Sequence, residues 1–192
     1  LLYFVSEVLY IMRKQDIYSL PELVQSFVNY QLTVKNKSEL TVLEYASDLR
    51  TFFRFLKLKK NLVTDDTSFN KIVINDINED FIKSIRITDI YAFLAYCQMN
   101  LKNNAKTRSR KVSAVRMFFK FLSSQGIIEN NPAKDLDSPN VNKSLPKYLT
   151  LEQSQNLLDS VDGQFFERDY CILTFFLNCG MRLSELVGLN LN

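Results

Sequence analysis

The chain has 192 residues, of which 46% are hydrophobic and 23% charged, and a formal net charge of +3. This composition is typical of a globular protein and excludes a disordered chain, and the length suits one ordinary domain or two small ones. There is no histidine, and the three cysteines (Cys97, Cys171 and Cys179) lack metal-ligand spacing. A metal site built on His or Cys and a histidine-based catalytic dyad are therefore excluded. We expect the three thiols to lie reduced in a cytosolic core.

Residues 1–11 are apolar apart from Glu7 and end just before Met12. They lack the basic start and the small-residue cleavage site of a signal peptide. They are also shorter than the roughly 20 apolar residues that a membrane span needs. Two interpretations stay open: Met12 is the true start and residues 1–11 are a non-native upstream extension, or they form a short extra helix.

Glycine and proline, four of each, are few enough to predict helices joined by short turns. Apolar residues from Leu20 to Leu32 recur at three- and four-residue spacing, which predicts a first helix. A second helix is expected to begin near Ser38, a favourable N-cap residue, and to continue through Leu56. Residues 59–78 are polar and irregular, which predicts a long loop with room for one short turn.

Two more helices are predicted before the first cluster of prolines. One has Thr88 at its N-cap and ends near Leu101. The other starts near Thr107 and stops at Gly126, a residue suited to the end of a helix. Its apolar residues fall on one face, which predicts a core contact: Val112, Val115, Phe118, Phe119 and Leu122. The opposite face forms a basic stripe: Lys106, Arg110, Ser113, Arg116 and Lys120.

Positive charge is concentrated in this predicted fourth helix. Between Lys102 and Ile128 there are seven lysines or arginines and no acidic residue, so the rest of the chain is net negative. Such a concentration is expected of a surface that binds a polyanion, and ordinary solvated faces usually mix both signs. We interpret the stripe as a DNA-binding face; the alternative is a merely solvated surface.

The predicted second helix adds a weaker indication of DNA binding. Short hydroxyl side chains at a helix start, such as Ser38 and Thr41, can bond phosphates with the help of the helix dipole. Tyr45 lies one turn further along. The alternative is that Ser38 is only a cap and that Tyr45 belongs to the core.

A domain boundary is predicted in residues 139–147, where two prolines with Ser and Asn favour an extended linker. Residues 12–138 then form an N-terminal domain. Residues 148–192 begin a second domain, in which Thr150 and Gln153 form a capping box that opens a short helix. Three helical pieces bury too little surface to be stable alone, so we expect this second domain to be unfinished.

The last predicted helices flank an arginine. A strongly apolar helix from Arg168 to Cys179 ends at Gly180, and another begins near Arg182. A guanidinium placed directly after a helix-ending glycine can point into a cleft and matches the geometry of a phosphate. Glu185, three residues on, can hold it. The alternative is an ordinary surface pair.

Several short motifs occur in a fixed order along the chain, and the series resembles the Xer-like branch of the tyrosine recombinases and phage-type integrases. The motifs are Ser38-Glu39-Leu40-Thr41 with Tyr45 and Asp48-Leu49, Thr107-Arg108 followed by Lys111 to Arg116 and Phe118-Phe119, Asn131-Pro132, Leu145-Pro146, Leu149-Thr150, and Gly180-Met181-Arg182 with Glu185-Leu186.

This resemblance implies an all-α fold: an N-terminal, SAM-like core-binding bundle of four to five helices, a linker, and the first helices of an incomplete catalytic domain. The bundle grips duplex DNA in such proteins. In that family a tyrosine attacks the scissile phosphate to give a 3′-phosphotyrosine, with no metal or nucleotide cofactor. Arg182 matches the first catalytic arginine, and Glu185 matches its supporting acid. The expected DNA contacts are Ser38, Thr41, Tyr45, Lys106, Thr107, Arg108, Arg110, Lys111, Ser113, Arg116 and Lys120.

The family's lysine, its His-x-x-Arg box and its nucleophilic tyrosine have no match in the chain. We therefore expect a C-terminally truncated fragment that binds DNA as a monomer and is inactive. The intact parent is expected to be an enzyme that acts as a homo- or hetero-tetramer on paired sites, in the cytoplasm and associated with the nucleoid. Two alternatives stay open: a stand-alone protein that occupies recombination sites without cutting them, and a helical protein-interaction module.

Overall fold

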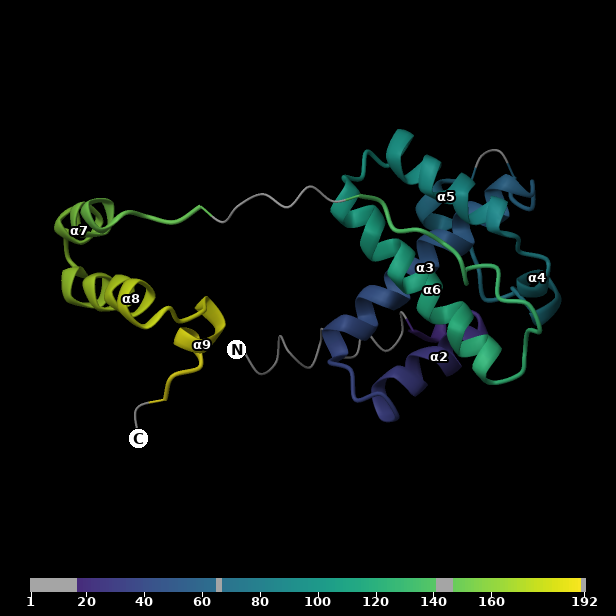
Figure 1. Ribbon diagram of the computed structural model, residues 1–192, viewed down its shortest axis with the longest axis horizontal. Helices are drawn as coiled ribbons and strands as arrows, with labels where there is room; N and C mark the ends of the chain where they lie inside the picture. Colours follow the sequence, from purple (N-terminus) through teal and green to yellow (C-terminus); the bar gives the residue numbers. More distant parts are fainter. Residues whose placement is uncertain (1–16, 65–66, 141–146, 191–192) are drawn as a thin grey trace. The chain divides into compact units, whose positions relative to one another are not determined.

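The structure is a computed structural model that describes residues 17–64, 67–140 and 147–190. These residues form helices and no strand, which confirms the predicted all-α fold (Figure 1). The chain divides into two compact units, Leu1–Asn142 and Lys143–Asn192. The expectations for residues 1–11, and for the part of the linker at 141–146, lie outside the described residues. No helix in the described ranges is long and apolar enough to cross a membrane.

The first unit is a bundle in which α6 packs against three other helices, α2, α3 and α5 (Figure 1). Its described elements are α2 (Glu22–Thr33), α3 (Glu39–Lys59), the 3-10 turn η1 (Phe69–Lys71), α4 (Glu79–Lys83), α5 (Ile87–Met99) and α6 (Ala105–Ser124).

Phenylalanine rings fill the centre of this bundle. The ring centroid of Phe118 on α6 lies 5.6 Å from that of Phe27 on α2 and 5.8 Å from that of Phe53 on α3, both edge to face. Such edge-to-face pairs add to the free energy gained by burying the rings. The whole apolar face predicted for the fourth helix is buried, which confirms that interpretation: Val112, Val115, Phe118, Phe119 and Leu122.

The ends of α3 and α6 follow local signals in the sequence. Ser38 is the N-cap of α3, as predicted, and its Oγ accepts a hydrogen bond from the backbone N–H of Thr41 at 3.3 Å. The helix α6 begins at Ala105, two residues before the expected start near Thr107, and Asn104 is its N-cap. Past its last turn Gly126 has φ +72°, a left-handed conformation that glycine adopts without steric cost.

The predicted start of α5 is wrong. Thr88 lies inside the helix, and Arg86 is the N-cap residue. The cause is Asp89, whose carboxylate accepts a hydrogen bond from the backbone N–H of Arg86 at 2.9 Å and another from Nζ of Lys59 at 2.5 Å. An acid three residues after the N-cap accepts from a backbone N–H that would otherwise lack a partner. The helix therefore begins earlier in the chain than Thr88 predicted.

The segment predicted as a long polar loop is more ordered than its composition indicates. It contains η1, and three isoleucines within it are buried in the core: Ile72, Ile74 and Ile77. Lys57 of α3 fixes the segment, because its Nζ donates to the carbonyl of Val73 at 2.9 Å and to the carboxylate of Asp76 at 2.7 Å. The short helix α4, which directly follows, was not expected from the sequence.

The second unit contains α7 (Leu151–Asp159), α8 (Phe166–Cys179) and α9 (Leu183–Val187). The capping box predicted at the start of α7 is present: Oγ1 of Thr150 accepts from the backbone N–H of Gln153 at 3.2 Å, and Oε1 of Gln153 accepts from that of Thr150 at 2.9 Å. Gly180 ends α8 with φ +62°. None of the residues 147–190 is fully buried.

The three cysteines do not share one environment. Cys97 on α5 is buried, and burial raises the pKa of its thiol to about 11. Cys171 and Cys179, both on α8, are exposed. The expectation that all three lie in a core is therefore wrong for the second unit, because its three helices leave the sides of α8 uncovered.

We expect iodoacetamide at about pH 8 to alkylate Cys171 and Cys179 in the folded chain and to leave Cys97 unmodified, because the thiolate is the reactive form and Cys97 is both buried and protonated. Mass spectrometry of the digested protein measures each site. In a urea-unfolded control all three cysteines should react. Equal rates for Cys97 and Cys171 in the folded chain would contradict the buried position of Cys97.

Candidate nucleic-acid interface

The starts of α3 and α6 carry many of the polar residues predicted as DNA contacts. At the start of α3, Oγ of Ser38 lies 2.8 Å from Oγ1 of Thr41. At the start of α6, Oδ1 of Asn104 accepts a hydrogen bond from the backbone N–H of Thr107 at 2.8 Å. Backbone N–H groups and the helix dipole make such ends favourable for anions.

The two helices begin on the same side of the first unit and cross one another (Figure 1). The contacts follow the same order along both helices. Asp48 of α3 meets Lys111 of α6 at 2.9 Å, and further along both helices Phe53 meets Phe118. The polar starts of α3 and α6 therefore belong to one side of the bundle.

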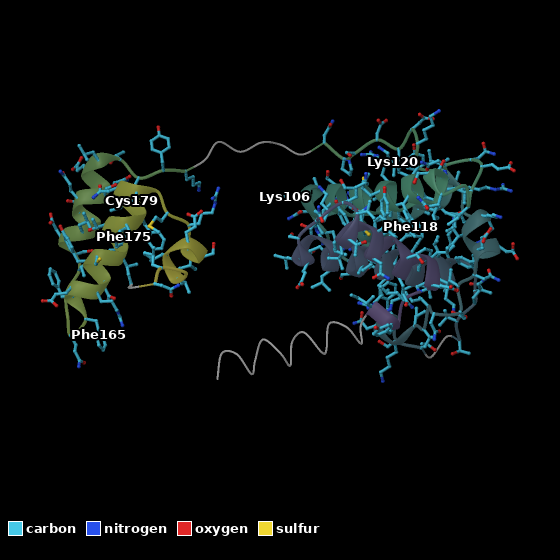
Figure 2. The ribbon with its side chains drawn as sticks, turned by 90° about the horizontal axis from the view of Figure 1, so that it is seen from below. Lys106, Phe118, Lys120, Phe165, Phe175 and Cys179 are labelled. Carbon is cyan, nitrogen blue, oxygen red and sulfur yellow. The ribbon has the colours of Figure 1, made fainter. Side chains whose placement is uncertain are left out.

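Two lysines of the predicted stripe are exposed. Lys106 in the first turn of α6 and Lys120 near its end both lie on the outside of the unit, whereas Phe118 lies inside (Figure 2). Neither lysine forms an ion pair with any residue that the structure describes. We call Lys106 and Lys120 the exposed lysines of α6. Nearby, Nη1 of Arg108 donates to the backbone carbonyl of Asn103 at 2.7 Å. This bond holds the Arg108 guanidinium over the start of α6.

The two cations in the middle of α6 converge on one buried carboxylate. Asp48 of α3 is only 1% exposed. Its Oδ1 accepts a hydrogen bond from Nζ of Lys111 at 2.9 Å, and its Oδ2 lies 2.8 Å from Nη1 of Arg110. Arg110 also pairs with the carboxylate of Glu44, one turn earlier on α3. Burial raises the pKa of Asp48, and the charges of Lys111 and Arg110 oppose that rise.

Three of the predicted DNA contacts already have partners within the fold. Lys111 is buried and bound to Asp48, so its ammonium group is already occupied inside the unit. Arg110 is partly exposed but already paired with two acids. Arg116 donates from Nη2 to the backbone carbonyl of Leu136 and to Oγ of Ser138 at 3.3 Å, so it holds the chain that follows α6 against that helix.

The remaining predicted contacts are uncharged. Tyr45 is half-buried, with its ring centroid 6.1 Å from that of Phe27, so part of the ring belongs to the core. Oγ of Ser113 donates to the carbonyl of Ser109 at 3.0 Å. Thr107 is partly exposed in the first turn of α6. Their contacts with DNA stay predictions.

In the second unit, Arg182 and Glu185 form a local pair at the start of α9. The Glu185 carboxylate accepts from the backbone N–H of Arg182 at 2.7 Å and from its Nη1 at 3.0 Å. The side chain of Arg182 is 82% exposed. One glutamate thus caps the helix and orients the guanidinium, while the other guanidinium nitrogens stay open to solvent.

Asp48 and Glu44 were not assigned a role from the sequence, although a pattern pointed to Asp48. It lies three residues after Tyr45 and four before Phe52, on the apolar face of its helix. An acid on such a face needs a cationic partner, because a buried unpaired charge is strongly destabilising. No group of three or more His, Cys, Asp or Glu side chains suited to a metal ion occurs within the described ranges.

Basic groups gathered on one helix of an α-helical bundle are the electrostatic feature expected of a nucleic-acid-binding domain. Residues 24–126 match the family model described as the phage integrase N-terminal SAM-like domain. The chain therefore belongs to the phage integrase family of tyrosine recombinases, as its motifs predict.

Curated relatives agree with this assignment. The chain is 45% identical over 173 residues to "Tyrosine recombinase XerC" of Caldanaerobacter subterraneus subsp. tengcongensis, which covers 90% of this chain and 49% of the relative. It is 33% identical over 171 residues to "Tyrosine recombinase XerC" of Thermodesulfovibrio yellowstonii, covering 88% and 49%. The chain spans about half the length of these relatives. No solved structure matches the chain significantly.

Replacing Asp48 by Asn should lower the free energy of unfolding by about 3–5 kcal/mol, because Lys111 would stay buried without a charged partner. Urea unfolding followed by circular dichroism measures this change. Glu79→Gln is the matched control: it removes a half-exposed pair with Lys83 and should lower the free energy of unfolding far less. Equal losses in the two variants would show that the Asp48 pair is not a buried one.

Proposed function

We propose that the first unit binds duplex DNA through the side of α6 that carries the exposed lysines, together with the start of α3. The observation that carries this proposal is the absence of any acid between Lys102 and Ile128, next to seven basic residues. Lysine and arginine contacts with phosphates release condensed counterions, and this release drives binding to DNA of any sequence.

The geometry of α6 supports contacts with more than one phosphate. Lys106 and Lys120 are separated by fourteen residues, which corresponds to about 21 Å along a helix. Phosphates recur every few ångströms along a duplex, so two cations this far apart engage different phosphates. The hydroxyls of Ser38 and Thr41 at the start of α3 offer neutral donors for the same backbone.

We propose that Arg182, oriented by Glu185, contacts the scissile phosphate and stabilises the charge that develops on it. An exposed guanidinium with donors left open suits a phosphate, and one glutamate already fixes its position. The named relatives are tyrosine recombinases. The whole protein would accordingly cut and rejoin DNA through a phosphotyrosine, as a tetramer on paired sites, in the cytoplasm on the nucleoid.

The double variant Lys106→Gln/Lys120→Gln should bind duplex DNA at least tenfold more weakly at about 0.1 M salt, and the slope of log affinity against log salt should fall by about 1.8, because two phosphate contacts are lost. Fluorescence anisotropy of a labelled duplex with the 192-residue chain measures both quantities.

The control is Lys71→Gln/Lys134→Gln, which removes the same charge from exposed positions outside α6. It should change the affinity by less than about twofold. Equal weakening in the two double variants would indicate a general charge effect and contradict an interface on α6. No binding by the unmodified chain at the lowest salt would contradict the proposed function itself.

Residues 1–192 alone should bind DNA without cutting it, because one arginine stabilises charge but supplies neither a nucleophile nor a proton donor. The measurement is an incubation with a nicked suicide duplex, followed by denaturing electrophoresis to detect a covalent adduct. The recombinase from Caldanaerobacter subterraneus is the positive control. A tyrosine-linked adduct formed by this chain would overturn the expectation.

A further inference from the structure

Arg110 lies between an interior acid and a surface acid on the same neighbouring helix. Its Nη1 is 2.8 Å from Oδ2 of Asp48, whose side chain is 1% exposed. The same nitrogen pairs with Oε2 of Glu44, whose side chain is 51% exposed. The arginine itself is 40% exposed, so the guanidinium reaches from the interior to the surface where α3 and α6 meet.

One hydrogen bond, from Lys111, and two ion pairs of Arg110 hold this cluster together. Lys111 donates a well-formed hydrogen bond to Oδ1 of Asp48. By contrast, Nη1 of Arg110 and Oδ2 of Asp48 have no hydrogen-bond partner among the described residues, although they are in ion-pair contact. Moving Arg110 away from Glu44 therefore leaves Asp48 with its hydrogen-bonded cation, Lys111.

We infer that Glu44 is an internal competitor of DNA phosphate for Arg110 and that it weakens DNA binding by this protein. The inference rests on the proposed function and names a regulator of the same surface. In the free protein the Glu44 carboxylate occupies the outer side of the Arg110 guanidinium. In the complex a phosphate oxygen takes that place, and the carboxylate is left close to another negative charge.

The exchange is physically feasible because the pair is partly exposed. Exposed ion pairs are weak and are screened by salt, so a phosphate from a highly charged duplex can displace Glu44. Every binding event must break this pair, whereas the buried pair of Asp48 and Lys111 stays intact. Glu44 thus keeps Arg110 from binding any isolated anion tightly and lowers affinity for DNA of every sequence.

The test is duplex binding by the 192-residue chain, measured by fluorescence anisotropy across a range of salt concentrations. Glu44→Gln, which keeps the shape and removes the charge, should bind roughly fivefold more tightly at low salt, the size expected for an exposed pair. The gain should shrink as salt rises, because salt screens the pair of Glu44 and Arg110 that binding has to break.

Two further variants separate competition from a general charge effect. Glu22→Gln removes an exposed acid from the first turn of α2, outside the proposed interface, and should change affinity by less than about twofold. In an Arg110→Gln background, Glu44→Gln should give no gain, because its target is absent; thermal melting of each variant confirms folding. An equal gain from Glu22→Gln, or a gain that persists without Arg110, would overturn the inference.

The outcomes also distinguish this inference from the proposed function. Binding by the unmodified chain with no gain in Glu44→Gln contradicts the competitor role alone. No binding by any variant at the lowest salt contradicts the proposed function and the inference with it. Binding that appears only in Glu44→Gln supports both, because removal of the competitor would then have uncovered the site.

Discussion

The buried carboxylate of Asp48 determines how α3 meets α6, and the rest of the first unit depends on that crossing. A charge that is 1% exposed is tolerated only with cationic partners, and both partners come from consecutive residues of one helix, Arg110 and Lys111. A buried ion pair adds little net stability, but it penalises every arrangement that separates its members. The pair therefore favours the crossing in which Phe118 meets Phe53 and in which both helix starts share one side.

The cations of α6 serve different purposes, although they look alike in the sequence. Lys111 belongs to the interior, and Arg116 holds the following segment to the helix. Lys106 and Lys120 are exposed and have no ion-pair partner among the described residues. Counting basic residues thus overstates the charge available to a nucleic acid. The number of phosphate contacts, and with it the salt dependence of binding, depends on which cations are already paired within the fold.

Local signals in the sequence were sufficient to predict features that residues within one helical turn determine. The Ser38 cap, the Thr150 capping box and the glycine end of α8 at Gly180 each involve residues no more than four apart, and each was predicted. The pairing of Lys111 with Asp48 spans 63 residues, so no periodicity in either helix indicates the partner. The prediction of the start of α5 was wrong for a related reason, because the acid that caps this helix also binds a lysine from α3.

The two candidate DNA-contacting regions differ in what holds them in place. Arg182 is oriented by Glu185 within a single helical turn. Its orientation therefore depends on local hydrogen bonds and not on a packed core, since none of the residues 147–190 is fully buried. The surface on α6 depends on tertiary contacts: if Asp48 loses its partners, the helix crossing and the spacing of the surface groups change together. Arg110, with its partner Glu44, belongs to the same cluster of charges as Asp48. The proposed DNA surface of the first unit is therefore coupled to the stability of its fold, whereas the position of Arg182 in the second unit is set by its own helix start.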